Sequence, residues 1–159
     1  MRVFVGCFFM KTLIIGIGNR DRGDDAAGPL AAAYLRSRLA GSAIRVIEAS
    51  GEATELMEYW TGAETVILID AICSASKPGM VTRLDLRSAE LPEGLLRCST
   101  HSFGVAEAVQ LARALGRLPE NIILYGIEAI QFQHGSAPSL EVEAGACNAA
   151  ELVIQAIQA

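Results

Sequence analysis

The sequence has no excess of positive charge, and this excludes two classes of partner. Lysine and arginine together number 13, against 18 aspartate and glutamate residues, so the formal net charge is −5. Proteins that bind nucleic acid carry a basic patch for the phosphate backbone, and clusters of lysine and arginine attract proteins to anionic membranes. Neither pattern occurs here. We therefore expect no nucleic-acid partner and no membrane partner.

Long uninterrupted apolar runs are also missing. The N-terminal stretch MRVFVGCFFMKTLIIGIG has one basic residue followed by an apolar run, as a secretory signal does. Lys11 and Thr12 interrupt this run, which is too short to span a bilayer and is followed by no small-residue cleavage site. We predict a cytoplasmic protein in which residues 1–9 are an upstream extension and residues 10–159 form the folded domain.

Several motifs of hydrolases and metalloproteins are absent. The four cysteines, Cys7, Cys73, Cys98 and Cys147, include no C-x-x-C pair. Their spacing favours neither a zinc knuckle nor a disulfide framework, and we expect most of them to be small buried hydrophobic residues. There is no G-x-S-x-G elbow of a serine hydrolase and no H-E-x-x-H helix of a zinc protease.

What the sequence does contain is a regular alternation of strand-like and helix-like segments. Because 52% of the residues are hydrophobic and 19% are charged, the chain should be globular, and its 159 residues without an internal linker predict a single α/β domain. Strands are predicted at Leu13–Ile17, Ile44–Glu48, Thr65–Ile69, Met80–Leu86 and Ile122–Gly126, and helices at 28–39, Ala53–Trp60, Phe103–Leu115 and Leu140–Gln158.

This alternation predicts a mainly parallel sheet with helices on both faces, apart from one connection. Only nine residues separate Asp70 from Met80, and they include Pro78-Gly79 and no helical pattern. A crossover between parallel strands needs a dozen or more residues. The strand Met80–Leu86 should therefore run antiparallel to its neighbours, near an edge of the sheet.

Three polar residues fall beyond the carboxyl ends of predicted strands, where sites of open α/β sheets gather. They are Asp25 after a glycine turn, Asp70 at the end of TVILID, and His101 before a helix. Singly, each has an ordinary explanation as a helix-start, turn or surface residue. Together, two carboxylates and an imidazole suit a divalent transition metal or a general acid–base pair.

A dinucleotide-binding fold is the main alternative from the residues alone. The segment GIGNRD begins like the G-x-G-x-x-G fingerprint, and Glu48 follows at a distance suited to a ribose hydroxyl. However, Asp21 stands where the third glycine belongs, and the carboxylates Asp24 and Asp25 would repel phosphate. An acidic turn of this kind favours a cation instead.

Four blocks in order, GIGNRDRGDDAAG, SGEATELM, LIDAICSASKPG and STHSFGVAEAVQLARALG, followed by ILYGIEA, resemble the hydrogenase maturation endopeptidases from Met10 onward. These enzymes remove the C-terminal extension of the nickel-iron hydrogenase large subunit precursor after nickel insertion. The resemblance implies a three-layer α/β/α sandwich around a five-stranded, mainly parallel twisted sheet with one antiparallel strand. The first carboxylate, aspartate here, is often glutamate in relatives.

The resemblance also implies a site and a partner. The metal-contacting and catalytic residues of the family fall on Asp25, Asp70 and His101. The expected metal is nickel supplied by the precursor, with zinc or cadmium able to substitute, and the expected partner is the large subunit precursor. Two alternatives remain at this point: a non-proteolytic metal-binding accessory protein of hydrogenase assembly, and a dinucleotide-binding oxidoreductase.

Overall fold

The structure, a computed structural model, describes residues 11–92, 95 and 102–159. Its strands are β1 (Thr12–Ile17), β2 (Arg45–Ala49), β3 (Thr65–Ile72), β4 (Val81–Asp85) and β5 (Asn121–Glu128). Its helices are the short 3-10 helix η1 (Gly23–Ala26) and the α-helices α1 (Ala27–Arg38), α2 (Ala53–Trp60), α3 (Ser102–Ala114) and α4 (Leu140–Gln158). The five predicted strands and four predicted α-helices are confirmed, with small shifts at their ends, whereas η1 was not predicted.

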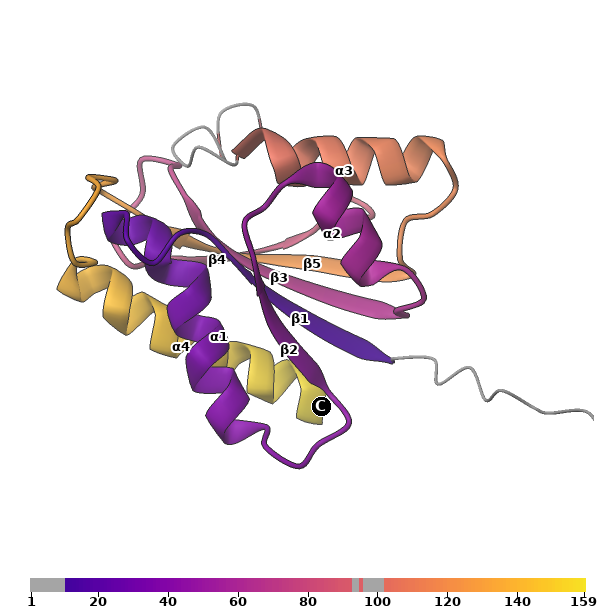
Figure 1. Cartoon of the computed structure of the whole chain (residues 1–159), viewed down its shortest axis with the longest axis horizontal. Coiled ribbons are helices and arrows are strands. Elements are labelled where there is room, and N and C mark those ends of the chain that lie inside the picture. The colour runs from indigo at the N-terminus through magenta and orange to yellow at the C-terminus, as the bar shows by residue number, and fades with distance from the viewer. Residues whose placement is uncertain (1–10, 93–94, 96–101) are drawn as a thin grey trace, which may run out of the picture.

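The strands form one twisted sheet in the order β2-β1-β3-β5-β4 (Figure 1). The pairs β1–β2, β1–β3 and β3–β5 are parallel, and β4 pairs antiparallel with β5 at the edge. The short connection between β3 and β4 explains this arrangement, because it has no room for a crossover helix. The predicted antiparallel edge strand is therefore confirmed.

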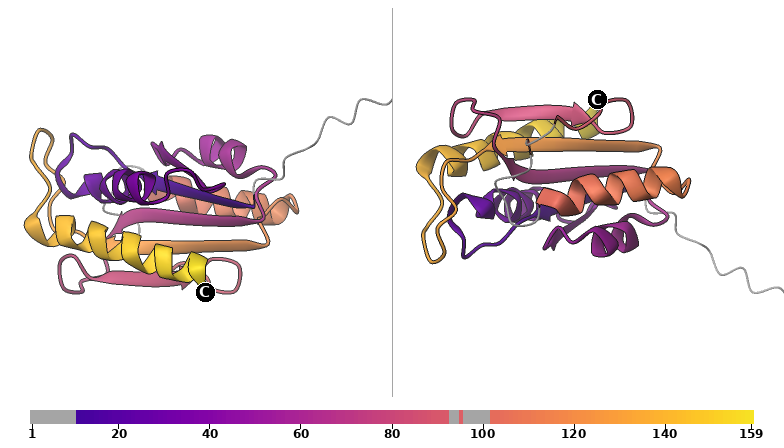
Figure 2. Two further views of the ribbon diagram at one scale, coloured as in Figure 1. Left: turned by 90° about the horizontal axis from the view of Figure 1, so that it is seen from below. Right: turned by 90° about the horizontal axis from the view of Figure 1, so that it is seen from above.

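Helices cover both faces of the sheet, which makes three layers. Helices α2 and α3 contact each other on one face, and α1 and α4 contact each other on the other (Figures 1 and 2). Alternate side chains of β1 enter the two cores: Leu13, Ile15 and Ile17 join the cluster with α2 and α3, and Ile14 joins the cluster with α1 and α4. This is the period of two expected for a strand covered on both sides. The α/β/α sandwich is confirmed.

The cysteines differ from the expectation. Cys147 lies on the exposed side of α4 and is free. Cys73, directly after β3, is partly buried and disulfide-bonded. The expectation that the cysteines form no disulfide is therefore wrong for Cys73, since sequence spacing does not report which side chains approach in space. Cys7 and Cys98 lie outside the described residues.

Within the described part of the chain, no helix has the length and apolar character needed to cross a bilayer. The predicted upstream extension, residues 1–9, lies outside the described residues. The boundary at Met10 therefore stays a prediction.

Candidate functional site

Two glycines bring the acidic turn against the ends of β1 and β3. Gly18 has a φ of +140°, and a Cβ there would overlap the carbonyl oxygen of Asp25. A Cβ on Gly28, in the first turn of α1, would overlap the carbonyl oxygens of Ile17 and Ile69. Only glycine allows both the left-handed backbone and such close approach. As a result η1 contacts β3, and Asp25 is brought near Asp70.

Asp25 lies in η1 and is fully buried. Its Oδ2 accepts a hydrogen bond from the backbone N–H of Asn19 at 3.1 Å and lies 4.0 Å from Nη1 of Arg22. The residue before α1 is Ala26, and no side chain caps this helix. The explanation of Asp25 as a helix cap is therefore wrong. Its carboxylate instead faces the turn that connects β1 to η1.

Asp70 is also fully buried, and it lies within β3 rather than at its end, because the strand continues to Ile72. It stands opposite Gly126 of β5. Its Oδ1 accepts a hydrogen bond from the N–H of Ala71 at 2.8 Å, while its Oδ2 has no hydrogen-bond partner among the described residues. A buried carboxylate oxygen without a donor is costly to the fold, which is typical of a functional site.

The two carboxylates influence each other electrostatically. Burial raises the pKa of Asp70 well above its usual range, the negative charge of Asp25 raises it further, and the hydrogen bond from Ala71 opposes both effects. Two ionised carboxylates that lie close together in a buried site repel each other. A divalent cation between them would offset that repulsion.

Asp24, the neighbour of Asp25, has a different role. It is fully buried, and its carboxylate accepts hydrogen bonds from the N–H groups of Ile130 (2.8 Å) and Gln131 (3.1 Å). It also accepts from the N–H (2.7 Å) and the hydroxyl (2.8 Å) of Ser139. Asp24 therefore fixes the connection between β5 and α4 to the acidic turn.

Arg22 is a site residue that the sequence did not reveal. Its guanidinium stacks over the ring of Phe132 at 5.3 Å from the centroid and lies near Asp25. Phe132 belongs to the connection between β5 and α4, 110 residues further along the chain, so no local pattern predicted the contact. The sequence alone shows only that a basic residue, Arg22, lies two residues before the acidic pair Asp24 and Asp25.

The third predicted residue, His101, lies outside the described residues. Among the residues that the structure does describe, no three histidine, cysteine, aspartate or glutamate side chains form a metal-binding group. The structure thus brings Asp25 and Asp70 together, and the placement of His101 beside them stays a prediction. Both carboxylates are fully buried.

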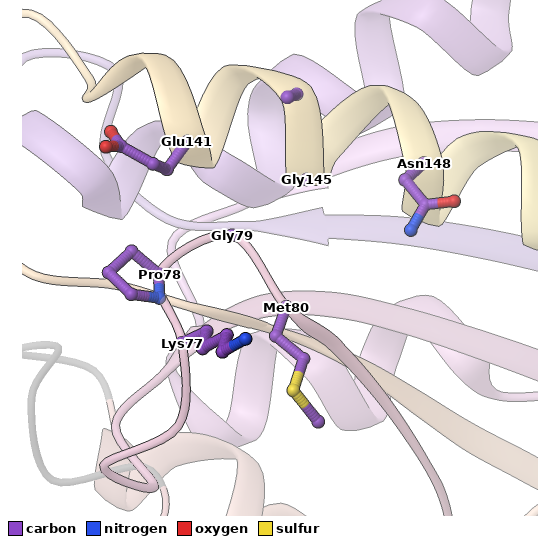
Figure 3. Close-up of a pocket in the computed structure, with 8 residues that line it drawn as sticks. Lys77, Pro78, Gly79, Met80, Glu141, Gly145 and Asn148 are labelled. Atoms are coloured by element: carbon purple, nitrogen blue, oxygen red, sulfur yellow. The ribbon is translucent and has the colours of Figure 1, made fainter.

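A cavity of about 500 Å³ lies elsewhere, between the β3–β4 turn and α4. Pro78 and Met80 line one side, and Glu141 and Asn148 line the other (Figure 3). Its lining includes neither Asp25 nor Asp70. It is therefore separate from the acidic site.

Glu48, the predicted ribose ligand of a dinucleotide fold, is already engaged. Its carboxylate accepts hydrogen bonds from Arg20 at 2.7 and 3.0 Å and from Arg36 at 2.9 Å. These bonds lower the pKa of Glu48, the bond from Arg20 having the largest effect. Glu48 thus holds the β1–η1 turn to the end of β2.

Comparison with known proteins decides between the remaining alternatives. Residues 29–156 match the hydrogenase maturation protease family. The chain belongs to this family. It is therefore a peptidase, and the interpretations as a dinucleotide-binding oxidoreductase or a non-proteolytic accessory protein are wrong.

Individual relatives agree with this assignment. The chain is 28% identical over 137 residues to the hydrogenase 2 maturation protease of Escherichia coli, covering 83% of this chain and 82% of that protein. It is 29% identical over 132 residues to the hydrogenase expression/formation protein HupD of Bradyrhizobium diazoefficiens, covering 80% and 67%. Against HupD of Thiocapsa roseopersicina it spans only 55% of the relative's length.

Solved structures of the family share the architecture. The [NiFe] hydrogenase maturation protease HybD from Thermococcus kodakarensis superposes with a TM-score of 0.70 at 28% identity, covering 92% of this chain and 98% of that one. The maturating endopeptidase HybD from E. coli has a TM-score of 0.78 at 22% identity, covering 93% and 92%, and shows the shared fold.

Proposed function

We propose that this peptidase removes the C-terminal extension of the large subunit precursor of a nickel-iron hydrogenase after nickel insertion. Asp25, Asp70 and His101 recognise the nickel that the precursor carries. The observation that supports this best is the pair of buried carboxylates, which come from η1 and β3 and include an oxygen of Asp70 with no hydrogen-bond donor among the described residues. The names of the relatives, which refer to hydrogenase maturation, support the choice of substrate.

The chemistry of these side chains fits nickel. Carboxylate and imidazole ligands suit divalent transition metals, and zinc or cadmium would accept the same set. A cation would offset the repulsion between Asp25 and Asp70 and would engage the oxygen of Asp70 that lacks a donor. Because both carboxylates are buried, nickel can reach them only if the surrounding chain moves.

In this proposal nickel belongs to the substrate. Ligation by the peptidase docks the precursor and holds its C-terminal segment against the site, which lowers the entropic cost of cleavage. A precursor without nickel lacks this anchor and is not positioned. Cleavage is thereby coupled to completed metal insertion.

The test compares nickel-loaded and nickel-free precursor, incubated with the purified peptidase and separated by mass. We expect the wild type to shorten only the loaded form, and Asp25→Ala, Asp70→Ala and His101→Ala to shorten neither. Asp21→Ala is the matched control, because Asp21 is an exposed acid of the same turn. Equal cleavage of both precursor forms by the wild type would contradict nickel recognition.

A further inference from the structure

Arg22 places a permanent positive charge beside one of the proposed metal ligands. Nη1 of Arg22 lies 4.0 Å from Oδ2 of Asp25, and the Arg22 side chain is 14% exposed whereas Asp25 is fully buried. An arginine guanidinium does not lose its proton in proteins. A cation that takes Asp25 as a ligand must therefore share the carboxylate with Arg22 or displace it.

The fold holds Arg22 in this position. Its guanidinium stacks over Phe132, which packs against the core beneath α1 and α4. The segment that carries Phe132 is fixed to η1 by the bonds from Ile130 and Gln131 to Asp24, and by a bond from the N–H of Gly23 to the carbonyl of Ser136 at 3.1 Å. Arg22 is thus held by a ring on one side and a carboxylate on the other, and displacing it costs stacking as well as an ion pair.

We propose that Arg22 is a specificity-determining residue, which disfavours binding of free divalent cations relative to a nickel ion already seated in the precursor. This inference rests on the proposed function. Electrostatic repulsion scales with the charge of the incoming ion. A hydrated divalent ion arrives with its full charge, whereas a metal seated in a protein is bound by deprotonated ligands that reduce its net charge. Arg22 therefore penalises the free ion more strongly, and the site stays available for the substrate.

The test is calorimetric titration of the metal-free protein with zinc chloride alone and with nickel chloride alone at pH 7.5. We expect Arg22→Met, which removes the charge and keeps an apolar stem against Phe132, to bind zinc at least about tenfold more tightly than the wild type. Arg22→Gln should show the same direction, and Arg22→Lys, which keeps the charge, should remain close to the wild type.

Arg38→Met is the matched control. Arg38 also stacks on a ring, that of Tyr34 at 5.6 Å, and also pairs with a carboxylate, that of Glu151, but at the other end of α1. This variant should bind zinc as the wild type does. Circular dichroism of each metal-free variant identifies the ones that fold, and Arg22→Gln carries the test if Arg22→Met does not.

The outcomes separate this inference from the proposed function. Unchanged or weaker zinc binding by the folded charge-removing variants overturns the role of Arg22. Adding Asp25→Ala to Arg22→Met should abolish the gain in affinity. If Asp25→Ala weakens binding in the wild-type background while Arg22→Met changes nothing, only the Arg22 inference fails. If Asp25→Ala has no effect in either background, the assignment of Asp25 as a metal ligand fails.

Discussion

At the scale of single residues, the site destabilises the fold that carries it. Asp70 is buried next to Asp25, and one of its oxygens has no hydrogen-bond donor among the described residues. Burial and the charge of Asp25 raise its pKa, so ionised Asp70 is disfavoured in the folded metal-free protein. Such a cost is common where a side chain serves binding rather than stability.

We predict that Asp70→Asn stabilises the metal-free protein at neutral pH by about 1–3 kcal/mol, because the neutral amide avoids burying a negative charge next to Asp25. The folded-state pKa of Asp70 is raised, so its contribution to stability is present below the unfolded-state pKa and is lost as the pH rises through the folded-state value. Urea unfolding at several pH values should therefore show a stability loss above pH 4 that is smaller in Asp70→Asn. A less stable variant at pH 7 would contradict this.

Ala75 is a second strained residue, in the turn between β3 and β4. Its φ is +60°, a left-handed conformation that is unfavourable for any residue with a Cβ. The turn is held by Ser74, whose N–H and hydroxyl both donate to the buried carboxylate of Glu128. Ala75→Gly should raise the free energy of unfolding by up to about 1 kcal/mol, measured by urea denaturation. Ala89→Gly, at a position with ordinary φ, is the control and should not stabilise.

At the scale of elements, repeating patterns were predictable and long-range contacts were not. The spacing of apolar residues and the residues that end helices located all nine predicted segments. Burial of one or both faces of a strand or helix determines this spacing. The nine-residue connection before Met80 was enough to fix the direction of β4. In contrast, Asp24 contacts Ile130 and Ser139, more than 100 residues away, and no local pattern encodes such a pairing.

The role of Asp24 gives a prediction about how η1 and α4 are joined. Removing its carboxylate leaves four hydrogen-bond donors in the β5–α4 connection without their acceptor, one of them the hydroxyl of Ser139, the N-cap of α4. Asp24→Ala should cost about 3–5 kcal/mol, more than an ordinary cap. Ser139→Ala, which removes only the hydroxyl, should cost about 1 kcal/mol. Similar losses in the two variants, measured by urea unfolding, would contradict the central role of Asp24.

At the scale of the whole molecule, the candidate site is a product of topology. In a parallel sheet the carboxyl ends of the strands meet at one edge, so residues from separate connections can converge there. In the structure η1, which carries Asp25, contacts β3, which carries Asp70, and both carboxylates are buried. The sequence indicated these two residues because a carboxylate that follows an apolar run or a glycine turn can be recognised locally. It did not indicate Arg22, whose relevance depends on Phe132 and the folded β5–α4 connection.

The last prediction tests whether the three proposed ligands act together on a metal. Metal ions bind neutral imidazole and deprotonated carboxylate, so protons compete for the same atoms. Binding of nickel, zinc or cadmium should weaken as the pH falls below about 6, near the reference pKa of histidine. The raised pKa of Asp70 adds to the effect in the same direction, because protonation of this carboxylate sets in at a higher pH than for an exposed aspartate.

Calorimetric titration of the wild type and of His101→Ala at pH 7.5 and 5.5 measures this loss of metal affinity. His134→Ala, at an exposed histidine, is the control. We expect His101→Ala to bind more weakly than the wild type at pH 7.5, with the difference shrinking at pH 5.5, where histidine is largely protonated. Equal affinity of the two proteins at both pH values would remove His101 from the ligand set, and the shared metal site would fail with it.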